Sequence, residues 1–288
     1  MNKTMSRKEE LKRTDFVVHV PASDANPILS LAMENEQSFA FAERLKWIIH
    51  DKVSCFFISP HLDDAIYSAG SLLSFLAEET DVKVVTLFTK ATHGVYSEAA
   101  KRWLKLSGHV DAEEHYSLRS IEDENACVEV GAKSVHSGFV ETMWRRKNFT
   151  TPMLGYNPPM YPEDERLMTE TQEFLRFLIS SSEPSVIFGP AAVRGHIDHI
   201  LTREIVERTF NNVILWLDFP YSQSAVAEDN LRLNGLPQAE WRGNNDKKVR
   251  GILAYESQNR ANFQAGIIIL PVERYYFNRS QNQSTLRA

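Results

Sequence analysis

The sequence predicts an α/β fold built on a parallel β-sheet. The pattern of apolar residues along the chain supports this prediction. Short apolar runs rich in β-branched and aromatic residues alternate along the chain with longer segments of helical periodicity. Strands that alternate with helices form βαβ units, and consecutive units build a parallel sheet with helices on its faces. The chain has 288 residues and is 43% hydrophobic, which is enough for one α/β domain with insertions.

The predicted elements follow one another regularly after an N-terminal arm. Residues 1 to about 33 are polar and irregular, and Glu34–Ile49 has helical spacing, so residues 1–50 form an arm and a helix. The predicted strands are Cys55–Ile58, Val82–Phe88, Ser134–Phe139, Val186–Phe188 and Val213–Phe219. The predicted helices are Ala65–Glu79, Ala112–Val130, Asp164–Ser181, Ile200–Asn211 and Asp246–Gln258.

Two irregular segments interrupt this pattern. Residues 140–162 carry Pro, Tyr, Trp and Arg with little periodicity, which favours a loop or lid over the edge of the sheet. Residues 220–244 form a second insertion. We therefore expect one domain over residues 51–260 and a C-terminal extension over 261–288 that contains one more apolar run, Gly266–Leu270.

Composition excludes several classes of function. The net charge of −6 and the pI of about 5.9 give no general attraction to nucleic acid or anionic lipid. The mixed-charge N-terminus has no secretory signal, and no stretch reaches the roughly 20 apolar residues of a membrane span. Cys55 and Cys127 fall within predicted elements and read as buried free thiols, consistent with a cytoplasmic protein. The oligomeric state stays open.

The first motif, "SPHLDDAIYSAG", follows the first predicted strand. It places His61, Asp63 and Asp64 between a buried strand and a helix. Adjacent carboxylates repel each other unless water solvates them or a positive group lies near them. An Asp pair before a helix is also a common N-cap with a favourable first-turn charge, so this motif alone does not establish a metal site.

The second motif, "GPAAVRGHIDHILTREIV", repeats the pattern after the strand Val186–Phe188. His196, Asp198 and His199 stand where the next helix begins, and the two histidines share a helix face. The ends of neighbouring parallel strands would bring both motifs together. His and carboxylate ligands with one open position are typical of catalytic zinc, and a remaining carboxylate beside the metal can act as general base. A single His-x-x-His is often incidental, so the prediction depends on the two motifs together.

"PHLDDA" and "GHIDH" resemble the two motifs of the PIG-L/LmbE-like family, zinc-dependent N-deacetylases that act on N-acetylglucosamine-type groups. The resemblance covers about residues 52–260 and implies a Rossmann-like parallel sheet sandwiched by helices. It implies that His61, Asp64 and His199 bind Zn2+. It also implies that Asp63 is the general base and that His196, kept charged by Asp198, stabilises the oxyanion and protonates the amine.

The motifs depart from the family pattern at three positions. Leu62 and Ile197 stand where the family usually has proline, which shapes the backbone without touching the metal. Some members carry a tyrosine just before the second motif, where this chain has Val193 and Arg194. The auxiliary role of that tyrosine is therefore lost or passes to Arg194.

Several further residues are candidates for substrate contact. The resemblance suggests that Arg119 reaches substrate hydroxyls, although a surface Arg paired with Glu122 or Asp123 is an equal alternative. Glu141 lies near the position of a substrate-binding acid in the family. In the lid, Trp144 could stack on a sugar ring beside Arg145, or the basic run could be a solvated face. Residues 215–223 end the last strand in an exposed aromatic and acidic cluster that could form another wall.

These residues predict a zinc-dependent hydrolase that removes an N-acetyl group from an amino-sugar or a specialised-metabolite substrate. The small molecule is the expected partner, without nucleic acid or membrane insertion. One alternative is a deacylase of a non-sugar, peptide-like natural product. Another is a catalytically idle metal-binding protein, which would have no need for Asp63. A nucleotide-binding protein is disfavoured because no Gly-rich phosphate loop follows the first strand.

Overall fold

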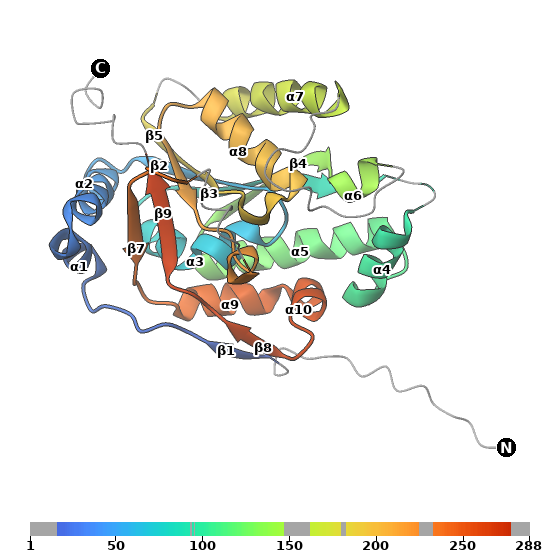
Figure 1. Ribbon diagram of the computed structural model, residues 1–288, viewed down its shortest axis with the longest axis horizontal. Helices are drawn as coiled ribbons and strands as arrows, with labels where there is room; N and C mark the ends of the chain where they lie inside the picture. The colour runs from blue at the N-terminus through green and yellow to red at the C-terminus, as the bar shows by residue number, and fades with distance from the viewer. Residues whose placement is uncertain are drawn as a thin grey trace.

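The centre of the molecule is a seven-stranded sheet. The computed structural model describes residues 16–92, 94, 96–146, 162–179, 183–224 and 233–277. The strand order is β4-β3-β2-β5-β6-β9-β7, with the first five strands parallel and the last two joined antiparallel (Figure 1). A separate two-stranded ribbon pairs β1 with β8. The predicted α/β fold with a parallel sheet between helices is confirmed.

The elements have the following bounds. The strands are β1 (Val17–His19), β2 (Ser54–Ser59), β3 (Val82–Lys90), β4 (Lys133–Val140), β5 (Ser185–Pro190), β6 (Val213–Trp216), β7 (Gln238–Trp241), β8 (Ile267–Ile269) and β9 (Glu273–Phe277). The α-helices are α1 (Pro27–Glu34), α2 (Glu36–His50), α3 (Asp64–Ala77), α4 (Glu98–Ser107), α5 (Ala112–Val130), α6 (Thr142–Arg145), α7 (Pro162–Leu178), α8 (Ile197–Thr209), α9 (Asp246–Ala254) and α10 (Glu256–Asn262). Among the described residues, the 3-10 helices are η2 (Val193–Gly195) and η3 (Tyr221–Ser224).

The strand order reverses between β2 and β5. From β2 the chain moves outward on one side through β3 to β4, and it then returns to build β5 and β6 on the other side. In open parallel sheets, ligands bind beyond the carboxyl ends of the strands at such a reversal. Both sequence motifs follow the two strands that flank it.

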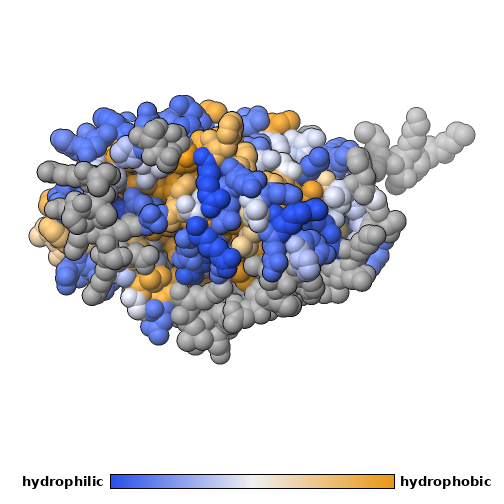
Figure 2. Space-filling model, turned by 90° about the horizontal axis from the view of Figure 1, so that it is seen from above, coloured by the Kyte–Doolittle hydropathy of each residue, from blue (hydrophilic) through white to orange (hydrophobic). Residues whose placement is uncertain are grey.

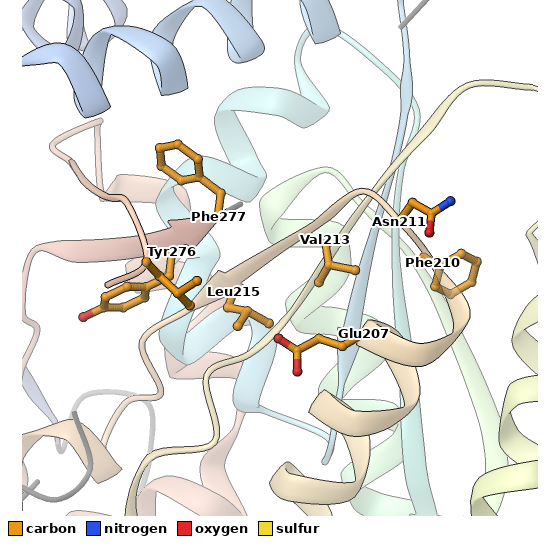
Figure 3. Close-up of a pocket in the computed structure, with 8 residues that line it drawn as sticks. Glu207, Phe210, Asn211, Val213, Leu215, Tyr276 and Phe277 are labelled. Atoms are coloured by element: carbon orange, nitrogen blue, oxygen red, sulfur yellow. The ribbon is translucent and has the colours of Figure 1, made fainter. Parts of the chain in front are cut away.

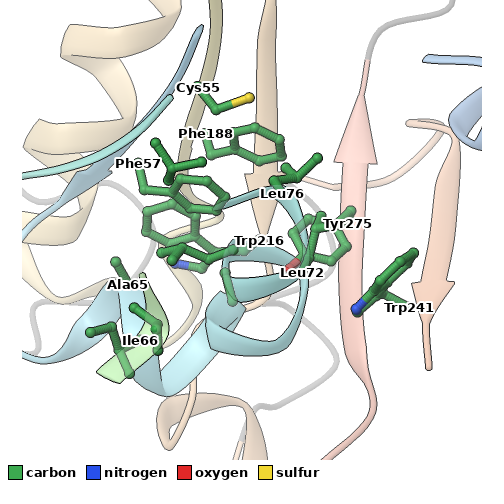
Figure 4. Close-up of a cluster of buried hydrophobic side chains, with 14 of the residues drawn as sticks. Cys55, Phe57, Ala65, Ile66, Leu72, Leu76, Phe188, Trp216, Trp241 and Tyr275 are labelled. Atoms are coloured by element: carbon green, nitrogen blue, oxygen red, sulfur yellow. The ribbon is translucent and has the colours of Figure 1, made fainter. Parts of the chain in front are cut away.

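Helices cover both faces of the sheet. The helices α7 and α8 pack on one face, and α3 and α5 pack on the other, with α9 packed against α3 and α5 (Figure 1). Alternation along β2 explains the two layers, because Phe57 points into the core beneath α3 while Phe56 and Ile58 point toward α8. The rings of Phe57 in β2 and Phe188 in β5 stack with centroids 4.2 Å apart, so they link the two strands at which the strand order reverses (Figure 4).

Four sequence expectations about the periphery were wrong. The segment before residue 34 is not wholly irregular, because it contains β1 and α1. The predicted helix over 246–258 is two helices, α9 and α10, separated at Tyr255. The expected C-terminal extension contributes β9 to the central sheet, between β6 and β7, and the insertion over 220–244 contributes β7.

The surface and the cysteines agree with the composition. Seen from above, hydrophilic residues cover much of the described surface, with apolar residues visible between them (Figure 2). None of the described helices is long and apolar enough to cross a bilayer. Cys55 and Cys127 are buried free thiols, as predicted.

Candidate metal centre and active site

The two motifs meet at the carboxyl ends of β2 and β5. These strands pair in parallel with Phe57 opposite Phe188, so the loops that follow them lie side by side. The ring of His61 lies 4.8 Å from that of His196 and 5.3 Å from that of His199, measured between centroids. All of the motif residues that carry chemistry are buried: His61, Asp63, Asp64, His196, Asp198 and His199.

His61, Asp64 and His199 form a compact set of metal ligands. Asp64 Oδ2 lies 3.0 Å from His61 Nδ1 and 3.2 Å from His199 Nε2. Within the described part of the chain, His199 Nε2 is buried and makes no hydrogen bond. A buried nitrogen without a hydrogen bond, facing a carboxylate oxygen, is what a metal-binding position requires. The residues therefore fit the three-ligand pattern of a catalytic zinc site.

A second set of potential ligands overlaps the first. His61, His196 and Asp198 also have ligand atoms within 4.8 Å of one another. However, Asp198 already contacts Arg145, with Oδ1 2.7 Å from Arg145 Nη2, and its Oδ2 accepts a hydrogen bond from the backbone N–H of Thr142 at 2.8 Å. Among the described residues, Asp64 has no such contact with Arg or Lys. Because Asp198 is already neutralised, the set that contains Asp64 is the better metal site.

Each ligand histidine has a carboxylate at its other nitrogen. His61 Nε2 lies 3.3 Å from Asp198 Oδ2, and His199 Nδ1 lies 2.7 Å from Asp218 Oδ1. Such partners fix the tautomer and the ring orientation of metal-binding histidines. The sequence prediction missed Asp218 and treated residues 215–223 as exposed. The structure buries Asp218 completely, directly after β6, which is the next strand to β5.

Asp218 also holds the loop of the second motif. Its Oδ2 accepts a hydrogen bond from the backbone N–H of Val193 at 3.3 Å. On either side of Val193, Ala192 and Arg194 have positive φ angles of 60° and 67°. For residues with a side chain, this left-handed conformation costs about 1 kcal/mol or more and persists where surrounding contacts enforce it. Asp218 therefore supports both the loop and His199.

Asp63 stands beside the ligand set without belonging to it. Its Oδ1 lies 3.7 Å from Arg119 Nη2. Burial and the adjacent Asp64 carboxylate raise the pKa of Asp63 to about 7, against the lowering effect of Arg119 and His61. A carboxylate with a pKa near neutrality is suited to take up a proton.

His196 is the N-cap of α8 and has a defined tautomer. Its Nδ1 accepts a hydrogen bond from the backbone N–H of Asp198 at 3.2 Å, so the ring proton of the neutral form is on Nε2. Burial and the neighbouring His61 and His199 hold the pKa of His196 well below its usual range. The expected charged His196, held by the Asp198 carboxylate, does not match this geometry. That carboxylate contacts Arg145, Thr142 and His61 instead.

The two ligand histidines have a different electrostatic environment. Although burial opposes it, Asp64 and Asp218 raise the pKa of His199 to about 9. Burial also opposes charge on His61, but Glu141, Asp198 and Asp64 raise its pKa well above the usual range. A metal ion at these nitrogens therefore displaces protons as it binds.

Arg119 and Glu141 are both buried beside Asp63. Arg119 is only 3% exposed, so the alternative of a surface residue paired with Glu122 or Asp123 was wrong. Its Nη1 lies 3.4 Å from Glu141 Oε2, and the Tyr116 hydroxyl donates to the same oxygen. The guanidinium also lies over the Tyr116 ring. Arg119 and Glu141 thus form a buried pair at one side of the site.

The expected lid residues lie elsewhere than predicted. Trp144 is 7% exposed and belongs to a hydrophobic cluster with Leu62 and Leu104. Its Nε1 donates to the Tyr116 hydroxyl at 3.0 Å, and its ring meets that of Tyr96 edge-on. Trp144 therefore packs as a core residue, and the expected stacking on a sugar ring is not supported. The rest of the expected lid, residues 147–161, lies outside the described residues.

Two residues at the second motif face solvent more than the others. Arg194 lies in η2 and is partly exposed. Tyr221, in η3, was missed by the sequence prediction; its ring lies 4.8 Å from that of His199 and 6.0 Å from that of His196. Tyr221 is close to the motif in space although it stands 22 positions after His199 in the sequence. It forms an aromatic wall beside the ligand set.

A small cavity of about 130 Å³ lies away from this site. It is lined by residues at the end of α8 and on β6 and β9, including Glu207, Phe210 and Tyr276 (Figure 3). Because α8 begins at the metal ligands and the cavity lies at its other end, none of the motif residues lines it. We assign the cavity no part in the chemistry.

Comparisons with known proteins agree with this geometry. The chain is 26% identical to 2'-N-acetylparomamine deacetylase of Streptomyces fradiae over 70% of its own length and 72% of that protein. Its fold matches a zinc-inhibited form of teicoplanin deacetylase with a TM-score of 0.65 at 23% identity, covering 80% of this chain and all of that one. A deacetylase–teicoplanin complex matches with the same TM-score at 24% identity, covering 78% and 97% of the two chains. The family described as GlcNAc-PI de-N-acetylase (PIG-L) matches residues 56–210, more than half of the chain, and the protein belongs to this family.

Proposed function

We propose that the protein is a zinc-dependent N-deacetylase that hydrolyses the acetamide of an amino-sugar group on a small molecule. The observation that carries the proposal is the convergence of His61, Asp64 and His199 on one buried point, with Asp63 beside them. A protein that only bound a metal would need the three ligands but not the additional carboxylate. Membership of a family of de-N-acetylases supports the same reaction.

The residues around the ligands divide the work of amide hydrolysis. His61, Asp64 and His199 would hold the zinc, which would supply a Lewis acid to polarise the amide carbonyl and to make water more acidic. Asp63 accepts a proton from the attacking water while the water oxygen forms a bond to the carbonyl carbon. The Nε2–H of His196 donates to the oxygen on which negative charge develops. The C–N bond then breaks, the amine nitrogen takes up the proton from Asp63, and acetate and the free amine leave.

The substrate class comes from the relatives. One relative is a deacetylase of 2'-N-acetylparomamine, and others are deacetylases of the teicoplanin biosynthetic pathway. These names share an N-acylated group on a specialised metabolite. We therefore favour an N-acetylated amino-sugar carried by a larger small molecule, and we keep a non-sugar, peptide-like amide as the alternative substrate.

The experiment measures zinc content and acetate release with the purified chain. We expect about one zinc per chain and acetate release from N-acetylglucosaminides or 2'-N-acetylparomamine, with loss of activity after chelation and recovery when zinc is returned. An N-acetylated peptide without sugar tests the alternative. If the zinc-loaded protein hydrolyses none of the N-acetylated compounds, the proposed reaction is wrong.

The Asp63→Ala variant tests whether Asp63 is the general base or a metal ligand. This variant should keep its zinc and lose about 10²- to 10⁴-fold in the rate of hydrolysis, the range found for removal of a general base. The conservative Asp63→Glu variant is the matched control for charge. Loss of zinc from Asp63→Ala would place Asp63 among the ligands and remove its assigned role.

A further inference from the structure

We propose that Arg145, anchored by Asp164, is a positioning residue that reserves Asp198 for His61 and so decides which of the two overlapping ligand sets holds the metal. The inference rests on the metal site of the proposed function and deepens it. Arg145 and Asp164 both lie outside the two sequence motifs. It also replaces the substrate-binding role that the sequence suggested for Arg145.

The guanidinium of Arg145 is held on several sides. Its Nη2 lies 2.7 Å from Asp198 Oδ1 and 3.3 Å from Asp164 Oδ1, and its Nη1 donates to the Val140 carbonyl at 3.0 Å. The ring of Phe88 lies beneath it at 5.2 Å from the centroid. The side chain is 13% exposed, while Asp198 is fully buried and Asp164 nearly so. A substrate group would have to displace an ion pair to reach Arg145.

The Asp198 carboxylate has two different oxygen environments. Oδ1 faces Arg145, and Oδ2 accepts the Thr142 N–H at 2.8 Å and lies 3.3 Å from His61 Nε2. Arg145 and Thr142 both belong to α6, so this short helix fixes the carboxylate from one side. The contact orients His61 with Nδ1 toward Asp64 and Nε2 toward Asp198. This orientation is the one that the ligand set with Asp64 and His199 needs.

Removal of Arg145 would change the choice between the ligand sets. Without Arg145, the Asp198 carboxylate is no longer held beside His61 Nε2, and His61 loses the partner that orients it for the set with Asp64 and His199. Asp198 would then become available to the metal together with His61 and His196, whose ligand atoms lie within 4.8 Å of one another. The ion would be shared between two sets, and His61, which belongs to both, would lose its fixed orientation. The contact with Arg145 prevents this by neutralising Asp198 in advance.

Asp164 anchors Arg145 from α7. It is 2% exposed and pairs with both Arg145 and Arg146. Arg146 shares this anchor, whereas the ion pair with Asp198 at 2.7 Å is made by Arg145. The neighbouring arginines therefore differ in the feature on which the proposal depends, and Arg146 is the matched control.

The experiment measures the affinity for Zn2+ by competition with a chromophoric chelator and records the absorption spectrum of the Co2+-loaded protein. We expect Arg145→Ala to bind Zn2+ about 10- to 100-fold more weakly, the range found when a partner of a metal-binding histidine is lost. Its Co2+ bands should shift because the ligand set changes. Arg145→Lys, which restores the charge, should recover part of the affinity, and Arg146→Ala should stay within about twofold of the unsubstituted protein.

A double-mutant cycle tests whether Arg145 acts through Asp198. In the Asp198→Asn background, Arg145→Ala should cause no further loss of affinity, because coupled residues are not additive. Equal losses in both backgrounds, or an Arg146→Ala effect as large as that of Arg145→Ala, would overturn the inference. Circular dichroism of the metal-free variants checks that they fold. If the unsubstituted protein itself binds no Zn2+, the proposed function fails; if it binds and Arg145→Ala binds equally well with an unchanged Co2+ spectrum, only this inference fails.

Discussion

Asp64 and Asp198 occupy the first turns of two helices that begin in similar ways, yet their surroundings differ. Asp64 opens α3 after β2, and Asp198 follows the first residue of α8 after β5. Both carboxylates are buried and both lie near His61. Asp64 faces two imidazole nitrogens and accepts the backbone N–H of His61, whereas Asp198 faces a guanidinium as well as one imidazole nitrogen and the backbone N–H of Thr142.

The difference teaches that the partner, and not the position, decides what an aspartate does at a helix start. A carboxylate such as Asp64, which has no arginine or lysine contact among the described residues, retains its charge for an ion. A carboxylate that is already neutralised by arginine acts as support for a neighbouring ligand. The sequence motifs contain both aspartates without any sign of this difference, because Arg145 lies outside them.

The largest effect is expected when the zinc binding of Asp64→Ala is compared with that of Asp198→Ala. Asp64→Ala should abolish stoichiometric zinc binding, because it removes the carboxylate that lies between His61 and His199. Asp198→Ala should keep bound zinc with affinity lowered by about 10- to 100-fold. Metal-to-protein ratios after dialysis and chelator competition measure both effects. Zinc retained by Asp64→Ala and lost from Asp198→Ala would reverse the assignment of the two residues.

A smaller effect should follow from substitution of Asp218, the outer partner of His199. Asp218→Ala removes the contact at His199 Nδ1 and the acceptor of the Val193 N–H, so zinc affinity should fall about 10- to 100-fold. Asp218→Asn keeps an oxygen acceptor and should lose less. Chelator competition measures the order of the two variants. Equal affinities of the Ala variant and the unsubstituted protein would show that Asp218 does not support the ligand.

The smallest effect should come from restoring the family's proline in the second motif. Ile197 is the first residue of α8, where proline is tolerated, and His196 has φ −64° and ψ 128°, which suits the residue before a proline. Ile197→Pro should therefore keep zinc binding and lower the free energy of unfolding by about 1 kcal/mol through lost apolar burial. Denaturant unfolding measures this cost. Loss of zinc from the variant would mean that Ile197 is required for the site in a way the backbone does not reveal.

The parallel half of the sheet and the motif residues could be predicted from sequence because their signals are local. β2 and β5 are short apolar runs, and the residues with chemistry follow each run within a few positions. The antiparallel half could not be predicted in the same way. In β9, Tyr275 and Tyr276 acquire a partner only through β6 and β7, which come from distant parts of the chain.

The roles of Asp218 and Arg145 were missed for the same reason, because their partners come from distant parts of the chain. Asp218 reaches His199 because β6 lies next to β5, and Arg145 reaches Asp198 because α6 folds over the motif loop. Neither contact has a signal in the local sequence. Trp144 was assigned to a lid because its neighbours are basic, but Tyr116 and Leu62 from other segments bury it. Long-range packing decided these three cases.

The arrangement of α3 and α8 has a consequence for the metal-free protein. Both helices start at the site, and each helix N-terminus carries about half a positive elementary charge from its aligned peptide dipoles. Asp63, Asp64 and Asp198 stand at these two ends, where the dipoles offset part of their mutual repulsion. The backbone thus lowers the cost of assembling three buried acids before any ion is present. The fold itself preorganises the ligands, and the ion does not have to assemble its own site.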